Sequence, residues 1–94
     1  MEKARIKTEK EIQAICLDTD VNGYHLKGQF FPNECFQYSN TIIEIVDRFS
    51  NNIVCACIID SEYHFFSVDA LDFKVNETEV KEKEEFNLFN YDKT

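Results

Sequence analysis

Residues 52–73 read "NIVCACIIDSEYHFFSVDALDF", and this stretch decides the fold because it holds two predicted strands joined by a turn. In an extended strand Cys55 and Cys57 share one face, the residues between them lie on the other, and both faces are apolar. Such a strand is typical of the middle of a sheet. We therefore expect residues 53–59 to form a central strand.

Turn signals flank this central strand on both sides. Residues 41–49, "TIIEIVDRF", form a predicted strand before it, and the intervening Asn51 and Asn52 tolerate the left-handed backbone of a tight hairpin. A second predicted turn, at Asp60 and Ser61, leads into the strand "EYHFFSV". The pattern predicts a meander of short, bent strands.

The meander ends in "DALDF", which favours a 3₁₀ turn at residues 69–71 before a last short strand at 72–75. His64 shares a strand face with Phe66 and Val68, which is typical of a packed core or edge histidine.

The N-terminal part predicts one strand and one helix. Residues 4–7, "ARIK", are a predicted strand, and Thr8 and Glu11 have the spacing of a capping box ahead of an amphipathic segment. We expect a helix of about three turns, which the Asp, Asn and Gly cluster of residues 18–28 ends as a loop or irregular edge. The fold class is therefore α+β, with one N-terminal helix packed on a small, strongly bent antiparallel sheet of about five strands.

Length and charge limit the possible functions. The chain has 94 residues and a net charge of −8, and residues 11–94 alone carry six basic and sixteen acidic side chains, a net −10. That charge repels phosphate backbones and argues against direct nucleic-acid binding. The longest apolar run, residues 53–59, is too short for a membrane span, and no secretion signal opens the chain. We expect one domain at residues 1–75 and a cytoplasmic protein with reduced cysteines.

The thiols raise the alternative of a small metal- or thiol-dependent enzyme that uses Cys55, Cys57 and His64. Zinc needs four convergent ligands. The other candidate ligands are Cys16, Cys35 and His25, and their spacing matches no common zinc module. Cysteine also packs as a small buried hydrophobe, so core thiols are favoured over metal or redox chemistry, and no cofactor is expected.

Residues 76–94 form a predicted tail, "NETEVKEKEEFNLFNYDKT", which mixes charges and then ends in aromatic residues. One interpretation is a solvated, partly disordered arm. In the other, the cluster of Phe86, Leu88, Phe89 and Tyr91 docks on the domain or on a partner, or adds to the sheet as an edge strand.

A resemblance covers residues 4–75, in the order "ARIKTEKEI", "GYHLKGQFFPNECF", "TIIEIV" and "YHFFSVDALDF". This order resembles small phage-encoded proteins of unassigned function, in which a strand and helix precede an SH3-like barrel. The chain departs from that group at Cys35, Asn40 and Ala70, where the group has Met, a lead-in glycine and a different closing turn. The resemblance implies an SH3-like barrel and a role in the cytoplasm of a bacterial host, either as an inhibitor of a nucleic-acid-handling or defence protein, as anti-CRISPR proteins are, or as a phage structural component.

Charge and composition favour a non-enzymatic protein that binds a basic partner protein. Carboxylates at predicted turns would steer association, and neighbouring tyrosines would supply desolvated anchors. We expect the following residues to be exposed and to form the partner-binding surface: Asp18, Asp20, Tyr24, Asp47, Asp60, Glu62 and Tyr63.

Overall fold

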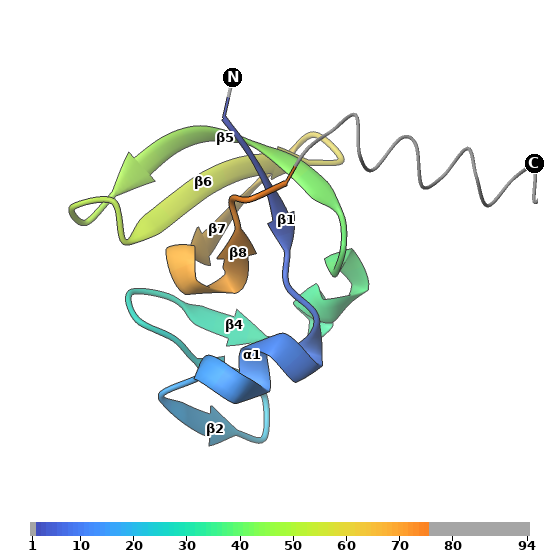
Figure 1. The fold of residues 1–94 in the computed structure, drawn as a ribbon, viewed down its shortest axis with the longest axis vertical. Helices are drawn as coiled ribbons and strands as arrows, with labels where there is room; N and C mark the ends of the chain where they lie inside the picture. Colours follow the sequence, from blue (N-terminus) through green and yellow to red (C-terminus); the bar gives the residue numbers. More distant parts are fainter. Residues whose placement is uncertain (1, 76–94) are drawn as a thin grey trace, which may run out of the picture.

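A computed structural model describes residues 2–75, which form an α+β fold with two antiparallel sheets (Figure 1). The elements, in chain order, are β1 (Lys3–Ile6), α1 (Glu9–Ile15), β2 (Asp18–Asp20), β3 (Gly23–His25), β4 (Phe30–Pro32), the 3₁₀ helix η1 (Asn33–Tyr38), β5 (Ile42–Phe49), β6 (Val54–Ile59), β7 (Glu62–Ser67), the 3₁₀ turn η2 (Val68–Ala70) and β8 (Leu71–Asp72). The predicted tail lies outside the described residues.

The larger sheet has the strand order β7-β6-β5-β1-β8 and curls strongly into a half-barrel. Its centre is the predicted meander, in which β6 pairs with β5 on one side and β7 on the other, so the central-strand prediction is confirmed. The pairing register shifts between Ile45 and Asp47, which is the signature of a β-bulge. A bulge increases local twist and bends its strand, which helps β5 to curl around the core.

Both hairpin turns form where the sequence predicts them. Asn51 and Asn52 have φ of 59° and 69°, and Asp60 and Ser61 have φ of 52° and 69°. Asn51 and Asn52 lie in a four-residue loop, residues 50–53, because Phe49 pairs with Val54, whereas Asp60 and Ser61 form a two-residue loop between Ile59 and Glu62. A two-residue loop with positive φ at both positions matches the right-handed twist of the strands that it joins. The β6–β7 hairpin therefore closes tightly and places Asp60 at its tip.

Helix α1 begins at the predicted capping box but is shorter than predicted. The Thr8 side chain accepts a hydrogen bond from the Glu11 backbone N–H, and the Glu11 carboxylate accepts one from the Thr8 backbone N–H. Seven residues give about two turns. Cys16, with φ −66° and ψ 154°, is already extended and ends the helix.

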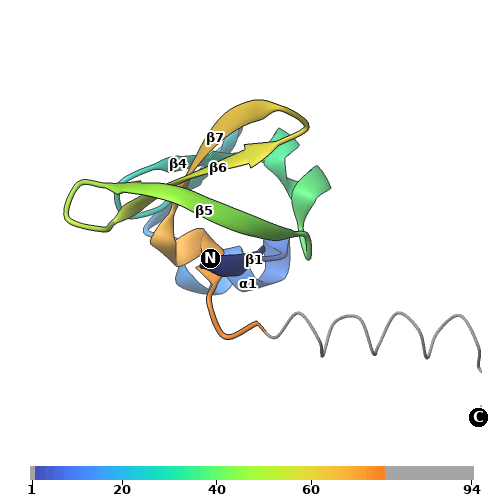
Figure 2. The same ribbon diagram turned by 90° about the horizontal axis from the view of Figure 1, so that it is seen from above.

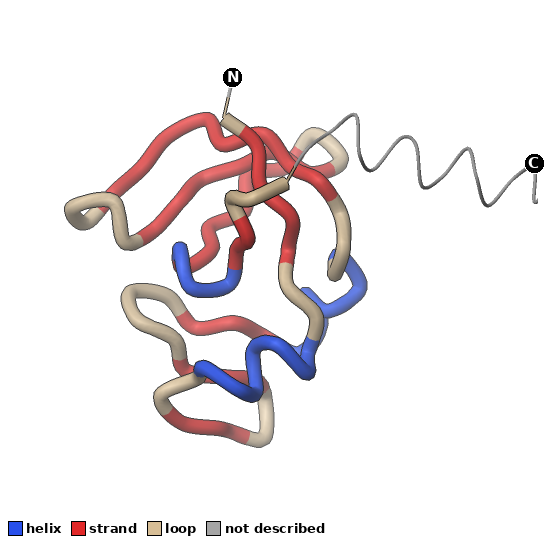
Figure 3. The backbone as a smooth tube through the Cα atoms, viewed as in Figure 1, coloured by secondary structure: helices blue, strands red, loops and turns tan. Residues whose placement is uncertain are grey.

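The prediction of a loop or irregular edge at residues 18–28 is wrong in part. Strands β2 and β3 form a hairpin there, and β4 adds to it as a third strand, Tyr24 pairing with Thr19 and Phe31. This small sheet lies below the half-barrel in Figure 1, and Figure 3 shows its short strands joined by loops next to α1. Its strands are too short, and too rich in Asp and Gly, to give an alternating pattern.

The core lies between the concave face of the half-barrel, α1 and the small sheet. Ile12 is the one buried residue of α1, and Phe31 of β4 contacts the Phe66 ring of β7 at a centroid distance of 5.8 Å. The buried cluster consists of Ala4, Ile6, Ile12, Tyr24, Leu26, Phe31, Ile43, Ile45, Cys55, Cys57, Phe66, Ala70 and Leu71. Residues from the helix and from strands of both sheets thus share one core.

One arginine ties three elements together at the edge of this core. The Arg5 guanidinium of β1 donates to both carboxylate oxygens of Glu11, at 2.9 and 2.8 Å, and to Asp72 of β8 at 3.2 Å. The hydrogen bond from Arg5 lowers the pKa of Glu11 to about 2, and the Thr8 backbone N–H contributes further. This bidentate pair holds α1 against β1.

Candidate partner-binding surface

The tip of the β6–β7 hairpin carries exposed acidic and aromatic side chains. Asp60 and Glu62 are exposed, and Tyr63 keeps 67% of its surface in solvent. Asp47 of β5 is exposed as well. Within residues 2–75 none of these three carboxylates takes part in an ion pair, because the pairs there use other acids. Among the described residues, this surface therefore has acidic side chains without an ion-pair partner and an exposed phenol ring.

A shallow groove lies on the convex face of β5, β6 and β7, the three strands that run side by side in Figure 2. Its volume is about 320 Å³, and Ala56, which is almost fully buried, lies between larger side chains. The Phe49 and Phe65 rings lie 5.9 Å apart across it, and both remain more than 40% exposed. Val46, Asp47 and Tyr63 complete the lining. Exposed rings beside one carboxylate suit a ligand that is both apolar and cationic.

A second hollow, of about 280 Å³, lies between the edge of β7 and η1. Its lining includes Glu34, Tyr38, Tyr63 and His64. Burial raises the pKa of Tyr38, and the negative charges of Asp60, Glu62 and Glu34 raise it further. Carboxylates from the hairpin tip and from η1 thus act on one phenol, and negative charges placed in this way favour a cation over an anion near the hollow.

His64 lies in this hollow between aromatic neighbours. Its ring stacks on Phe66 with an interplanar angle of 6° and meets Tyr38 edge-on at a centroid distance of 5.4 Å. The Nε2 atom is buried and has no hydrogen-bond partner among residues 2–75. The position that the sequence predicts for His64, on the strand face of Phe66, is confirmed.

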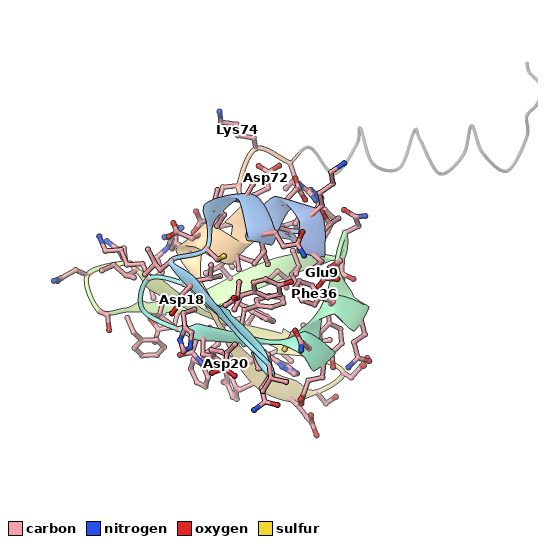
Figure 4. The ribbon with its side chains drawn as sticks, turned by 90° about the horizontal axis from the view of Figure 1, so that it is seen from below. Glu9, Asp18, Asp20, Phe36, Asp72 and Lys74 are labelled. Atoms are coloured by element: carbon pink, nitrogen blue, oxygen red, sulfur yellow. The ribbon has the colours of Figure 1, made fainter. Side chains whose placement is uncertain are left out.

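The structure separates the predicted partner-binding residues into two groups. Asp47, Asp60, Glu62 and Tyr63 belong to the half-barrel, whereas Asp18 and Asp20 lie along β2 in the small sheet. Figure 4 shows the two β2 carboxylates on the lower face of the molecule, on the side away from β5 and β6 in Figure 1. One partner surface of modest size would not span both groups.

The expectation that Tyr24 is exposed is wrong. Only 8% of its surface is in solvent, because β3 lies between β2 and β4 and turns Tyr24 toward α1 and η1. Its hydroxyl donates to the Glu9 carboxylate at 2.8 Å and accepts from the Gln13 amide at 2.9 Å. The ring meets Phe36 edge-on at 5.6 Å. Tyr24 is therefore a core residue with a satisfied hydroxyl.

The thiols lie where the core prediction places them. Cys55 and Cys57 are fully buried, and burial raises the pKa of Cys57 to about 11 and that of Cys55 as well. His64 lies opposite Cys57 on β7, yet the part of the chain that the structure describes has no group of three or more metal-binding side chains. A thiol whose pKa is raised by an apolar environment is a poor nucleophile at neutral pH.

The hollow beside β7 is the feature that sequence reasoning missed. Its far wall is η1, and the sequence of its residues, "NECFQY", has no periodicity that predicts a helix or a strand. The available signal was Pro32 before a short run of mixed residues, because proline suits the entry to a helical turn. No pattern in the sequence indicates that η1 lies across from β7.

We found no match between this chain and any family model, curated protein or solved structure. The described residues contain no helix with the length and hydrophobicity of a membrane span. Fold and surface define a class rather than a family: a small α+β half-barrel whose described residues present an acidic and aromatic face beside the outer edge of β7.

Proposed function

We propose that this protein acts by binding, and that its partner is a protein with a basic surface. The observation that carries the proposal is three exposed carboxylates, Asp47, Asp60 and Glu62, which form no ion pair among residues 2–75 and lie on the same hairpins as the exposed Tyr63. Charges at an exposed tip speed the encounter with a basic surface, and an adjacent tyrosine provides contact area at low entropic cost.

The half-barrel is compatible with an SH3-like barrel, and on the resemblance to phage-encoded proteins we extend the proposal to a biological setting. In that setting the protein works in the cytoplasm of a bacterial host, where it inhibits a nucleic-acid-handling or defence protein by occupying a basic channel. The net −10 over residues 11–94 supports this extension, because an acidic surface imitates the charge of the nucleic acid that such a channel holds.

The test compares two charge-reversed variants. One variant combines Asp60→Lys with Glu62→Lys at the hairpin tip, and the other combines Asp18→Lys with Asp20→Lys in β2. Each double substitution raises the net charge by four units, from −8 to −4. Association rates with a basic, nucleic-acid-binding bacterial protein are measured across a salt series. The tip variant should lose rate and salt dependence, and the β2 variant should keep most of both.

Equal losses in the two variants would mean that only net charge matters. A rate that ignores both salt and charge reversal would remove acidic steering from the proposal.

A further inference from the structure

The edge of β7 is open. β7 is one of the two terminal strands of the half-barrel sheet, β8 being the other, and no other described strand pairs with its outer side. Proteins usually cover, shorten or distort such an edge, because its unpaired backbone groups are a template for another chain. β7 spans six residues and pairs without a register shift along its whole length.

The register identifies which backbone groups face outward. A two-residue turn makes its flanking residues, Ile59 and Glu62, a hydrogen-bonded pair, and such pairs alternate along an antiparallel ladder. The bond from the Val68 N–H to the Ile53 carbonyl, at 2.8 Å, continues the same series. The N–H and C=O groups of Tyr63 and Phe65 therefore point away from β6.

Nothing in the described chain satisfies these outward groups. None of the other backbone or side-chain hydrogen bonds among residues 2–75 uses the main chain of Tyr63 or Phe65. The hollow beside η1 is lined by Tyr63, His64, Phe65 and Phe66, so it runs along this stretch of the edge. The edge thus combines free donors and acceptors with space beside them.

We propose that this open edge is a strand-addition site, at which an extended, Arg- or Lys-bearing segment of the partner pairs with Tyr63 and Phe65. The inference rests on the proposed function and gives its binding mode. Main-chain bonds supply affinity in such complexes, and the flanking hollows select the alternate side chains. One basic side chain enters the hollow beside Glu34 and Tyr38, near the carboxylates of the hairpin tip.

Charge argues for a basic partner segment over the other two occupants. A second copy of the chain brings another net −8, so the two copies repel each other. Residues 76–94 carry six acidic and three basic side chains, a net −3, so this chain's own C-terminal segment is also repelled by the tip. A cationic segment is attracted to the same edge.

The test uses the full chain and the capped peptide Ac-RVRVR-NH2, with backbone amide exchange read residue by residue by NMR. In the free protein the amides of Tyr63 and Phe65 should exchange fast and those of His64 and Phe66 slowly, since only the latter two bond to β6. The peptide should slow exchange at Tyr63 and Phe65 by about tenfold or more. A peptide with N-methylated valines loses main-chain donors and should bind about tenfold more weakly, as should Ac-EVEVE-NH2.

A pair of protein variants gives an independent reading. Phe65→Pro deletes one outward N–H, which an edge strand tolerates, and should abolish peptide binding, whereas Phe65→Ala keeps the N–H and should bind the peptide with continued protection at Tyr63. If Phe65→Pro does not fold, the N-methylated peptide still decides.

Five results would overturn the inference. Strand addition is excluded if the arginine peptide binds while the Tyr63 and Phe65 amides still exchange fast. It is also excluded if this peptide does not bind at all. Neither result affects the proposed function, which the charge-reversal variants test separately. Equal binding of the glutamate peptide would exclude recognition of basic side chains. Protection of both amides in the peptide-free monomer would assign the edge to the chain's own C-terminal segment. Protection that grows with protein concentration would assign it to a second copy.

Discussion

Replacing Cys55 with serine should lower the free energy of unfolding by about 1 to 3 kcal/mol, because a hydroxyl then enters an apolar site without a partner. Cys55 has no exposed surface, and the residues opposite it on the neighbouring strands are Arg48 and Phe66. Arg48 is already engaged by Glu2, at 2.7 Å, and by the Phe73 ring. A guanidinium also cannot accept a hydrogen bond from the new hydroxyl.

The matched control is Cys55→Ala, which removes the sulfur without adding a polar atom. It leaves a cavity of about methyl size, so its expected cost is about 1 kcal/mol. Serine should therefore destabilise more than alanine, although serine fills more of the space. Cys16→Ser, at a half-buried position, should change stability by less than about 0.5 kcal/mol.

Urea denaturation followed by circular dichroism measures these differences as a shift of the midpoint at constant slope. For a domain of this size, about 1 kcal/mol corresponds to a fall of roughly 4–8 °C in Tm. A serine variant as stable as the wild type would refute the apolar core around β6. If that variant also lost a measured activity, Cys55 would take part in chemistry and not in packing.

Three further predictions follow from the same structure. Glu11 has a pKa of about 2 in the fold against an ordinary 4.5, so its contribution to stability is complete above about pH 4.5 and is lost as the pH falls toward 2. Because its side chain is 42% exposed, we expect this contribution to be about 1 kcal/mol. Urea melts of wild type and Glu11→Gln at pH 7 and at pH 3 measure it as the difference in the free energy of unfolding. Burial raises the pKa of Cys55 and of Cys57, so both thiols should react slowly with a bulky alkylating reagent at neutral pH. Mass spectrometry after brief treatment should show both unmodified in the native protein and modified in denaturant. Rapid labelling of either thiol in the native protein would contradict their burial. Tyr24→Phe should lower the free energy of unfolding by about 1 kcal/mol in the same urea assay, because Glu9 and Gln13 lose the hydroxyl that both of them bind. An unchanged midpoint would show that this contact does not hold α1 to the small sheet.

The parts of the fold that sequence predicts are those controlled by neighbouring residues. The capping box of Thr8 and Glu11 starts α1, and pairs of residues that tolerate positive φ set both hairpins of the meander. The two apolar faces of "IVCACII" place β6 inside the sheet. In each case a few adjacent residues carry the whole signal.

The parts that sequence does not predict depend on contacts between distant segments. β1 pairs with both β5 and β8, through partners such as Ile43 for Ala4 and Leu71 for Ile6, and no local pattern encodes that insertion. The three strands of the small sheet gain their stability from pairing and from burial of Tyr24 and Phe31. Tertiary packing therefore overrides the loop signal of residues 18–28.

The candidate surface divides in the same way. Asp60, Glu62 and Tyr63 follow from a turn that the sequence itself reveals, and all three are exposed as expected. The hollow beside them needs η1 to lie across from β7, and Tyr24 is buried because α1 and η1 cover it. Turn chemistry thus locates exposed acids, but only the assembled fold shows which of them share a surface.

The most direct test of the central claim is one titration with two ligands under the same salt conditions. The wild-type protein is titrated with a basic, nucleic-acid-binding bacterial protein and, separately, with duplex DNA, and binding is followed by calorimetry. A net −10 over residues 11–94 predicts salt-sensitive binding to the protein and none to DNA. Tight binding to DNA alone would contradict the account.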